Sequence, residues 1–315
     1  MDFLPSADQA ALTEGVRTLL RQRFDRERLA AVTNGFDAAL WKQLTETGVF
    51  SIGTAEADGG LGMGVAEISL VSQELGRACV PGPVVATLVA TLAVPGLEPG
   101  SSVTLLDAAC EPLLVSHLDT ASHVLVLTDA GALLASSADV RGTPVSEPVD
   151  PHTPLWRVSE LPTGERIDAD IEWLGRVGAT LAAAFQVGMA ARCTELAVAY
   201  AKEREQFGKT IGSFQAVKHI CADMLARAEI ARAAVDAAAT TLDGRGSDGV
   251  GRAVSSAKLL ADEAAVQNAR ACIQVYGGMG FTWEVEVHYY LKRAWVLSTE
   301  WGSADDHAED LAALL

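Results

Sequence analysis

The sequence has few cysteines, and their spacing excludes the common metal sites and disulfide frameworks. The five cysteines are Cys79, Cys110, Cys193, Cys221 and Cys272. They form no C-x-x-C pair, and no histidine follows them at zinc-finger spacing. An odd number of scattered thiols is typical of reduced cysteines packed in the core of an intracellular protein. We therefore predict no metal centre, and we expect a cytoplasmic protein.

Positive charge and long hydrophobic runs are also scarce. The chain has 24 Lys and Arg against 41 Asp and Glu, a formal net charge of −17, which argues against a broad nucleic-acid interface. The longest apolar stretch, residues 177–191, is shorter than the roughly 20 residues that cross a bilayer, and residues 1–8 lack the features of a secretory signal. We predict no nucleic-acid partner, no membrane insertion, and a buried helix over this stretch.

With 315 residues the chain is long enough for several domains, and its periodicity divides it into three parts. Helical spacing of apolar residues over 1–98 predicts an N-terminal helical domain. Residues 99–165 contain β-type runs, a hairpin signal at 128–131 and several prolines, which predict a reduced middle β domain. The helical period returns over 166–315 and predicts a C-terminal four-helix bundle. The predicted fold class is mainly α with a small β domain.

Helix caps and faces are visible within these parts. In the N-terminal part, Asp37 stands at the N-cap position of a helix that runs to about residue 47, and Gly48 follows where a left-handed C-cap residue belongs. In the bundle, apolar residues recur at intervals of three and four over 213–242. This spacing predicts a core face formed by Val217, Cys221, Met224, Leu225, Ala228 and Ala231.

A glycine-rich segment, GGLGMG at 59–64, has the composition of a dinucleotide-binding loop. No convincing strand precedes it, and no βαβ unit surrounds it, so the Rossmann interpretation lacks its structural context. We interpret the segment as a tight connection that leads into a helix beginning at Val65.

Positive charge gathers at one point of this acidic chain, at the end of the first long bundle helix. The positively charged residues there are Lys202, Arg204 and Lys209, and the aromatic Phe207 lies between the last two. One explanation is that cations near a helix C-terminus complement the helix dipole. The other is a diphosphate clamp, because Arg204 offers a permanent charge in a planar fork and Phe207 an apolar face. Phe214 and Gln215 open the next helix, close enough to join such a pocket.

A second candidate segment, QVYGGMGF at 274–281, ends another long helix with three glycines. Glycine permits left-handed backbone and close approach of the backbone to a ligand. Alone, the pattern is only a helix stop. Together with the Arg204 turn, and without a Walker or Rossmann signature, it is a candidate for holding an adenosine diphosphate moiety.

Taken in order, these segments resemble the acyl-CoA dehydrogenases: GGLG at 59–62 before a helix ending ELGR at 74–77, REQFG at 204–208 with FQ at 214–215, and QVYGGMGF. The resemblance covers the N-terminal part and nearly all of the bundle. It implies FAD, an acyl-CoA substrate, an electron-transfer flavoprotein or similar acceptor, and a flavin ring lying in the adjacent subunit. Implied contacts to the adenosine and diphosphate part of FAD are Arg204, Phe207, Gly208, Phe214, Gln215, Gln274, Val275, Tyr276, Gly277 and Gly278.

The chain departs from this family at the catalytic base. Aligning Gly302 with the family's Tyr-Glu-Gly-Thr stretch puts Trp301 at the carboxylate position, and an indole cannot take a proton from carbon. The other position used in the family lies near Gly178, and residues 177–194 contain no acid. Only a register shift would bring Glu300 into place, so we predict no catalytic residue in this chain.

Because of these departures, the chain resembles the short, non-catalytic subunits of heterotetrameric (α2β2) acyl-CoA dehydrogenases of actinobacterial steroid degradation. The resemblance implies a full-length partner subunit that carries the catalytic glutamate, and a reduced middle domain that leaves room for a bulky acyl group. Two alternatives stay open. One is a self-sufficient homo-oligomeric dehydrogenase that uses Glu300, and the other is a non-enzymatic helical scaffold.

Overall fold

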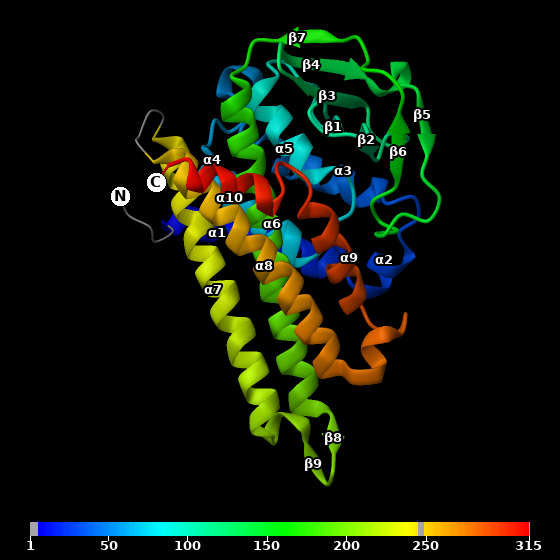
Figure 1. Cartoon of the computed structure of the whole chain (residues 1–315), viewed down its shortest axis with the longest axis vertical. Coiled ribbons are helices and arrows are strands. Elements are labelled where there is room, and N and C mark those ends of the chain that lie inside the picture. Colours follow the sequence, from blue (N-terminus) through cyan, green and yellow to red (C-terminus); the bar gives the residue numbers. More distant parts are fainter. Residues whose placement is uncertain (1–5, 245–248, 315) are drawn as a thin grey trace. The chain divides into compact units, whose positions relative to one another are not determined.

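The structure, a computed structural model, describes residues 6–244 and 249–314 (Figure 1). It contains two compact units that alternate along the chain. The first unit comprises residues 1–22, 69–79 and 179–315, and the second comprises 23–68 and 80–178. Each unit is thus assembled from separate stretches of sequence, while the predicted three-part division at residues 98 and 165 stays a prediction.

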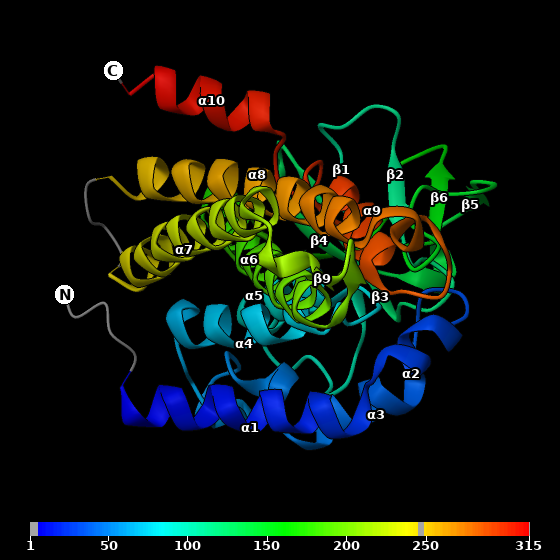
Figure 2. The same cartoon turned by 90° about the horizontal axis from the view of Figure 1, so that it is seen from below.

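The first unit is helical and holds the predicted bundle. Its helices are α1 (Ala7–Arg23), the end of α4 (Val65–Arg77), most of α6 (Ile171–Glu203), α7 (Gln215–Asp243), α8 (Val250–Tyr276), α9 (Val287–Leu297) and α10 (Ala304–Ala312). α7 and α8 lie side by side along most of their length (Figures 1 and 2). α10 begins with a capping box in which Ser303 and Asp306 satisfy each other's backbone N–H.

Two glycines bring α4 and α6 into direct backbone contact. A Cβ on Gly76 would lie 1.9 Å from the carbonyl oxygen of Phe185, and one on Gly188 would lie 1.9 Å from that of Gln73. Because no side chain fits there, the two helices approach as closely as their backbones allow. The Ser72 hydroxyl adds a hydrogen bond to the Leu181 carbonyl, 2.9 Å away.

The predicted core face of α7 is wrong at Leu225, which is 54% exposed. Successive residues of a helix are about 100° apart, so the neighbour of a buried residue can already face outward. The buried stripe of α7 is narrower and rich in alanine: Met224, Ala228, Ala231, Val235, Ala238, Ala239 and Leu242. It packs on α8, where the buried amide of Asn268 donates to the Met224 carbonyl at 2.8 Å. A stripe of small residues permits this close packing, and Leu225 lies outside it.

The second unit combines short helices with two small sheets. Its helices are α2 (Arg26–Ala31), α3 (Ala38–Glu46), the start of α4 and α5 (Val84–Ala93), with 3-10 turns η1 (Val49–Ser51), η2 (Glu56–Asp58) and η3 (Ser137–Asp139). Asp37 accepts from the Leu40 N–H as the predicted N-cap of α3, and Gly48 has the predicted left-handed backbone at φ 81°. The glycine-rich segment joins η2 to α4 without a preceding strand, which confirms its interpretation as a connection.

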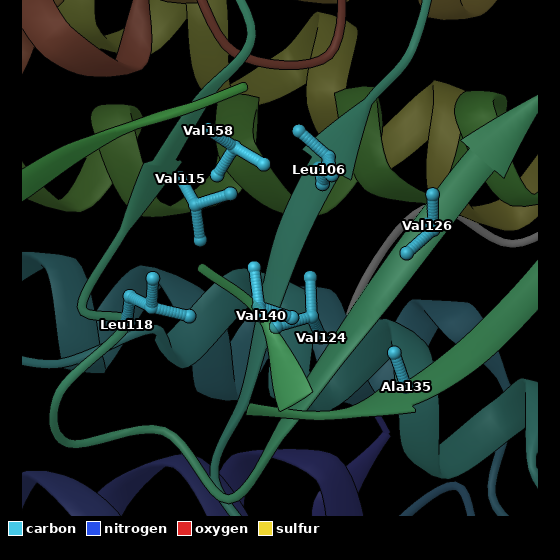
Figure 3. Close-up of a cluster of buried hydrophobic side chains, with 8 residues drawn as sticks. All are labelled: Leu106, Val115, Leu118, Val124, Val126, Ala135, Val140 and Val158. Carbon is cyan, nitrogen blue, oxygen red and sulfur yellow. The ribbon is translucent and has the colours of Figure 1, made fainter. Parts of the chain in front are cut away.

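The predicted β segment forms two sheets. A four-stranded sheet has the order β1 (Val103–Asp107), β3 (His123–Thr128), β4 (Gly131–Ser136), β7 (Glu165–Ile167), and a three-stranded sheet has the order β2 (Leu114–Ser116), β6 (Leu155–Val158), β5 (Gly142–Pro144). The predicted hairpin is confirmed in the pairing of Thr128 with Gly131. The strands enclose a cluster of apolar side chains (Figure 3): Leu106, Val115, Leu118, Val124, Val126, Ala135, Val140 and Val158.

The apolar stretch of α6 and most of the thiols lie in the interior. By length and composition α6 is the one described helix that passes for a membrane span, but its most apolar window is largely buried in the protein, as predicted for residues 177–191. Cys79, Cys193 and Cys272 are buried free thiols, and burial raises the pKa of Cys193 well above its ordinary value. Cys110 is exposed, so the prediction that the cysteines pack in the core is wrong for this residue.

Candidate functional site

The Arg204 segment folds into a tight hairpin at the end of α6. β8 (Glu205–Gln206) pairs with β9 (Lys209–Thr210) across a two-residue turn in which both Phe207 and Gly208 have positive φ, at 55° and 76°. The carbonyl of Arg204 accepts a 2.7 Å hydrogen bond from the Ile211 N–H, which closes the hairpin toward the next helix. The Arg204 side chain is exposed and forms no ion pair with any residue in 6–244 or 249–314. Its guanidinium is therefore available to an anion.

Two aromatic rings belong to the hairpin and to the residue just before α7. Phe207 is 92% exposed and meets Phe214 edge to face, with the ring centroids 6.2 Å apart. The Lys209 ammonium lies 4.3 Å from the centroid of the Phe214 ring. Gln215 is the exposed first residue of α7, after the short turn η4 (Ile211–Ser213). A large apolar ring in a left-handed turn costs about 1 kcal/mol in strain and exposes apolar area, so it is typical of a contact surface.

The glycine segment ends α8 with open backbone. Gly277 has φ 61° and ψ −136°, a conformation that side chains disfavour, and its N–H donates to the carbonyls of Gln274 and Ile273. A Cβ on Gly277 or Gly278 would meet no atom within 4 Å. At these two positions the backbone is therefore accessible to a ligand. The 3-10 turn η5 (Gly277–Phe281) follows, and Phe281 is 85% exposed.

A stacked tyrosine pair joins the two segments. The rings of Tyr200, one turn before Arg204, and Tyr276, directly before Gly277, lie 4.1 Å apart and within 12° of parallel. Burial raises the pKa of Tyr276 to about 12, so its phenol stays neutral. Figure 1 shows β8, β9 and the last turn of α8 at the same end of the long helices. The structure thus brings together the two segments that the sequence separates by about 70 residues.

All ten predicted site residues lie at this end of the first unit, but one side chain points inward. Val275 is only 7% exposed and packs in the core, so it can offer a ligand no more than its backbone. Tyr276 is half-buried and engaged with Tyr200. Arg204, Phe207, Gly208, Gln215, Gln274, Gly277 and Gly278 are exposed. A guanidinium, aromatic rings and open glycine backbone together fit the diphosphate and adenosine of a dinucleotide.

The turn at residues 300–303, which the resemblance aligns with the family's catalytic base, lies elsewhere in the first unit. Trp301 is buried in a left-handed conformation (φ 61°), and its backbone carbonyl accepts from His307 Nε2 at 3.0 Å. Its indole N–H is buried without a hydrogen-bond partner among the described residues. Glu300 is half-buried. Burial lowers the pKa of the Lys258 ammonium, and the negative charges of Asp262 and Glu300 act in the opposite direction. No acidic side chain occupies the position that Trp301 fills.

The sequence analysis missed a buried ion pair that supports this turn. Lys258 is fully buried on α8, and its ammonium lies 2.8 Å from both carboxylate oxygens of Asp262. It also donates to the carbonyl of Leu297, the last residue of α9, at 3.2 Å. Gln186 on α6 donates to the same Asp262 carboxylate at 2.6 Å. A Lys–Asp pair at i, i+4 is usually a solvated surface pair, so spacing alone gives no signal of its burial.

No group of three or more His, Cys, Asp or Glu side chains among the residues of the described ranges is arranged to hold a metal ion.

Comparison with known proteins shows the family of the chain. The sequence profile of the acyl-CoA dehydrogenase N-terminal domain matches residues 6–101, and that of the C-terminal domain matches residues 175–315. Acyl-CoA dehydrogenase IpdE2 of Mycobacterium tuberculosis is 33% identical over 92% of both chains. Acyl-CoA dehydrogenase FadE34 of the same organism is 37% identical over 80% of this chain, but the match spans only 38% of FadE34.

Solved structures share the fold at lower identity. The ChsE4–ChsE5 complex from Mycobacterium tuberculosis has a TM-score of 0.85 at 23% identity, covering 99% of this chain and 98% of that one. A Tcur3481–Tcur3483 steroid ACAD variant has a TM-score of 0.83 at 23% identity, covering 98% and 97%. PigA with FAD and proline has a TM-score of 0.83 at 20% identity, covering 100% and 99%. The chain therefore belongs to the acyl-CoA dehydrogenase family.

Proposed function

We propose that this chain is the non-catalytic subunit of a heteromeric, FAD-dependent acyl-CoA dehydrogenase. It lends the Arg204 hairpin and the glycine segment to the adenosine diphosphate part of FAD, while a full-length partner subunit carries the flavin ring and the catalytic carboxylate. The observation that carries this proposal is that Arg204, Phe207, Gly277 and Gly278 are exposed, while Trp301 and no acid stands where the resemblance expects the catalytic base.

The contacts to the dinucleotide follow from the side chains present. The unpaired Arg204 guanidinium donates to diphosphate oxygens, and the open backbone at Gly277 and Gly278 lets the chain approach the ligand without a Cβ in the way. Phe207 and Phe214 offer ring surface beside it. When bound, FAD supplies the acceptor for the hydride that leaves the acyl-CoA. The exposure of these groups on one surface supports their use by a second subunit.

The comparisons support the heteromeric form of the proposal. Two of the structures named above carry two protein names each, and one is called a complex. FadE34 contains a segment like this chain within a polypeptide of more than twice the matched length, which suits a function that needs a second dehydrogenase chain. We propose a steroid-derived or similarly bulky acyl-CoA as the substrate, since one neighbour is called a steroid ACAD. An electron-transfer flavoprotein or similar acceptor would reoxidise the flavin.

Replacing Arg204 with alanine tests the clamp directly. In the complex with a full-length dehydrogenase subunit, Arg204→Ala removes charge-assisted hydrogen bonds worth about 1.5–3 kcal/mol each, so FAD should dissociate at least about tenfold more readily. The measurement is flavin content and FAD affinity of the purified complex. Arg252→Ala is the control, because Arg252 is an exposed cation near the opposite end of α8. Equal flavin content in all three proteins contradicts the clamp.

Phe207→Asn separates folding from function. Asn-Gly is the preferred pair for a two-residue hairpin turn with positive φ at both positions, so the isolated chain should gain about 0.5–1 kcal/mol of stability. The complex should instead lose FAD affinity or subunit affinity, because the exposed ring is gone. Urea unfolding of the chain and FAD titration of the complex measure the two effects. A variant that is less stable alone, or that assembles and binds FAD as well as the wild type, argues against this role of Phe207.

A self-sufficient dehydrogenase using Glu300 is the second candidate, favoured by the position of Glu300 beside the buried Lys258 ammonium. Turnover of acyl-CoA by the complex separates the two candidates. Under the heteromeric proposal, Glu300→Gln leaves turnover within about twofold, because the partner supplies the base. Removal of a true catalytic base lowers the rate by a factor on the order of 100 to 10,000. A loss of that size after Glu300→Gln would show that Glu300 is the catalytic base and would contradict the heteromeric proposal.

A further inference from the structure

A groove lies in the first unit between α1 and α7, with α4 and α6 as its floor (helices in Figure 2). Its volume is about 960 Å³. The lining residues of α7 recur at intervals of three and four, from Ala228 to Ala237, and those of α1 do the same from Ala10 to Arg17. Such spacing is that of one helix face on each wall, so the groove follows the two helices for more than two turns.

Most charges in the groove already have partners. Arg17 donates from Nε and Nη2 to the two carboxylate oxygens of Glu74, at 2.8 and 2.7 Å. Arg77 pairs with Glu74 and Glu195, and Arg232 pairs with Glu229. These arginines are neutralised from within the unit, so the groove does not present an anion site.

Asp236 is different. It is half-buried on α7, and within the described ranges it has no ion-pair partner. Its Oδ1 accepts from the Gln73 amide at 2.9 Å, and Asp236 is one of the residues that line the groove. Burial raises its pKa, although Gln73 and Arg232 act in the opposite direction. Arg232 forms its ion pair with Glu229 and not with Asp236, so the partly desolvated Asp236 carboxylate can still pair with an incoming cation.

We propose that this groove receives an arginine or lysine side chain from a helix of the full-length dehydrogenase subunit, and that this cation pairs with Asp236. The inference rests on the proposed function, since it adds a second contact to the same partner. The alanines that flank Asp236 leave room for the apolar stem of such a side chain, and the negative carboxylate at the groove complements its charge.

The course of α7 connects this groove to the candidate FAD site. α7 begins at Gln215 within that site, and farther along it exposes the apolar side chains of Leu225 (54%) and Ile230 (57%) before reaching Ala233 and Asp236. Exposed apolar residues on a helix that starts in one contact surface and ends in another are typical of a continuous interface. The subunit that shares the FAD is therefore the occupant that the surface favours.

The test measures the affinity of this chain for the full-length subunit at saturating FAD. The full-length subunit is titrated into this chain, and native mass spectrometry detects the complex. Asp236→Asn keeps the acceptor for Gln73 but removes the charge, and it should weaken association at least about tenfold at low ionic strength. Ala233→Trp fills the groove from an exposed wall position and should have a similar effect. Asp223→Asn removes an equal charge from an exposed position of α7 outside the groove and should change the affinity less than twofold.

Different outcomes separate this inference from the proposed function. If the wild-type complex forms and binds FAD, but Asp236→Asn and Ala233→Trp associate as tightly as the wild type, only the groove contact is overturned. The same holds if Asp223→Asn weakens association equally, because a general charge effect would explain both. If the variants instead alter self-association of this chain and leave its affinity for the full-length subunit unchanged, a second copy is the occupant and the inference is wrong. Failure of the wild-type chain to bind the full-length subunit contradicts both proposals.

Discussion

Replacing Gly188 with alanine should prevent the first unit from folding, or lower its free energy of unfolding by at least about 3 kcal/mol. The new Cβ would lie 1.9 Å from the carbonyl oxygen of Gln73 and 2.7 Å from the backbone nitrogen of Arg77. Both are backbone atoms of α4, so no side chain can rotate to relieve the overlap, and the two helices would have to separate. Gly76→Ala should behave in the same way, because its Cβ would meet the Phe185 carbonyl.

The control for this prediction is Gly15→Ala. Gly15 lies in α1 of the same unit, and a Cβ there would meet no atom within 4 Å. Alanine in a helix interior is favoured over glycine by about 0.5–1 kcal/mol, so this variant should be slightly more stable than the wild type. Urea unfolding curves, recorded by circular dichroism, compare the wild type, Gly188→Ala and Gly15→Ala. A Gly188→Ala protein as stable as Gly15→Ala would show that α4 and α6 are not in backbone contact.

The second large effect is expected at Lys258. Lys258→Met removes the buried cation that neutralises Asp262, and breaking a buried ion pair from one side costs about 3–5 kcal/mol. The loss should appear as a lower urea midpoint with an unchanged dependence on denaturant. The end of α9 also loses its hydrogen bond from the Lys258 ammonium to the Leu297 carbonyl. The turn that contains Trp301 follows directly, so its indole fluorescence should shift as well.

A double variant isolates the cause. Lys258→Met combined with Asp262→Asn removes both charges and keeps an acceptor for the Gln186 amide. If the uncompensated carboxylate causes the loss, the double variant should recover more than half of it, because uncharged side chains often replace buried ion pairs without large cost. A double variant as unstable as Lys258→Met alone would locate the effect in the Leu297 contact. A single variant that loses less than about 1 kcal/mol would contradict the burial of this pair.

Local sequence signals predicted individual elements well. The Asp37 cap, the turn at Gly48, the hairpin at residues 128–131 and the long bundle helices follow from side-chain chemistry within a few residues. α5 was missed, since eight of its ten residues are buried and such a run has no polar face to reveal its period. The parallel pairing of β1 with β3 was also unpredicted, because register between distant strands depends on long-range packing.

The candidate site was predicted as two motifs, and only the structure shows them side by side. The Arg204 hairpin and the glycine segment are joined by the stacking of Tyr200 on Tyr276, two residues that are 76 positions apart in the sequence. The resemblance named Val275 as a contact, yet its side chain lies in the core because it shares the buried face of α8. The burial of Lys258 and the contact of Asp236 with Gln73 could not be predicted from the sequence either, since each depends on which helix faces meet.

The measurement that tests the central claim most directly is native mass spectrometry with flavin quantification, on this chain alone and co-expressed with a full-length acyl-CoA dehydrogenase subunit. The account predicts a flavin-poor protein without dehydrogenase turnover when the chain is alone. With the partner it predicts a yellow heteromer that contains both chains and oxidises acyl-CoA thioesters. Stoichiometric FAD and turnover in assemblies of this chain alone would contradict the account.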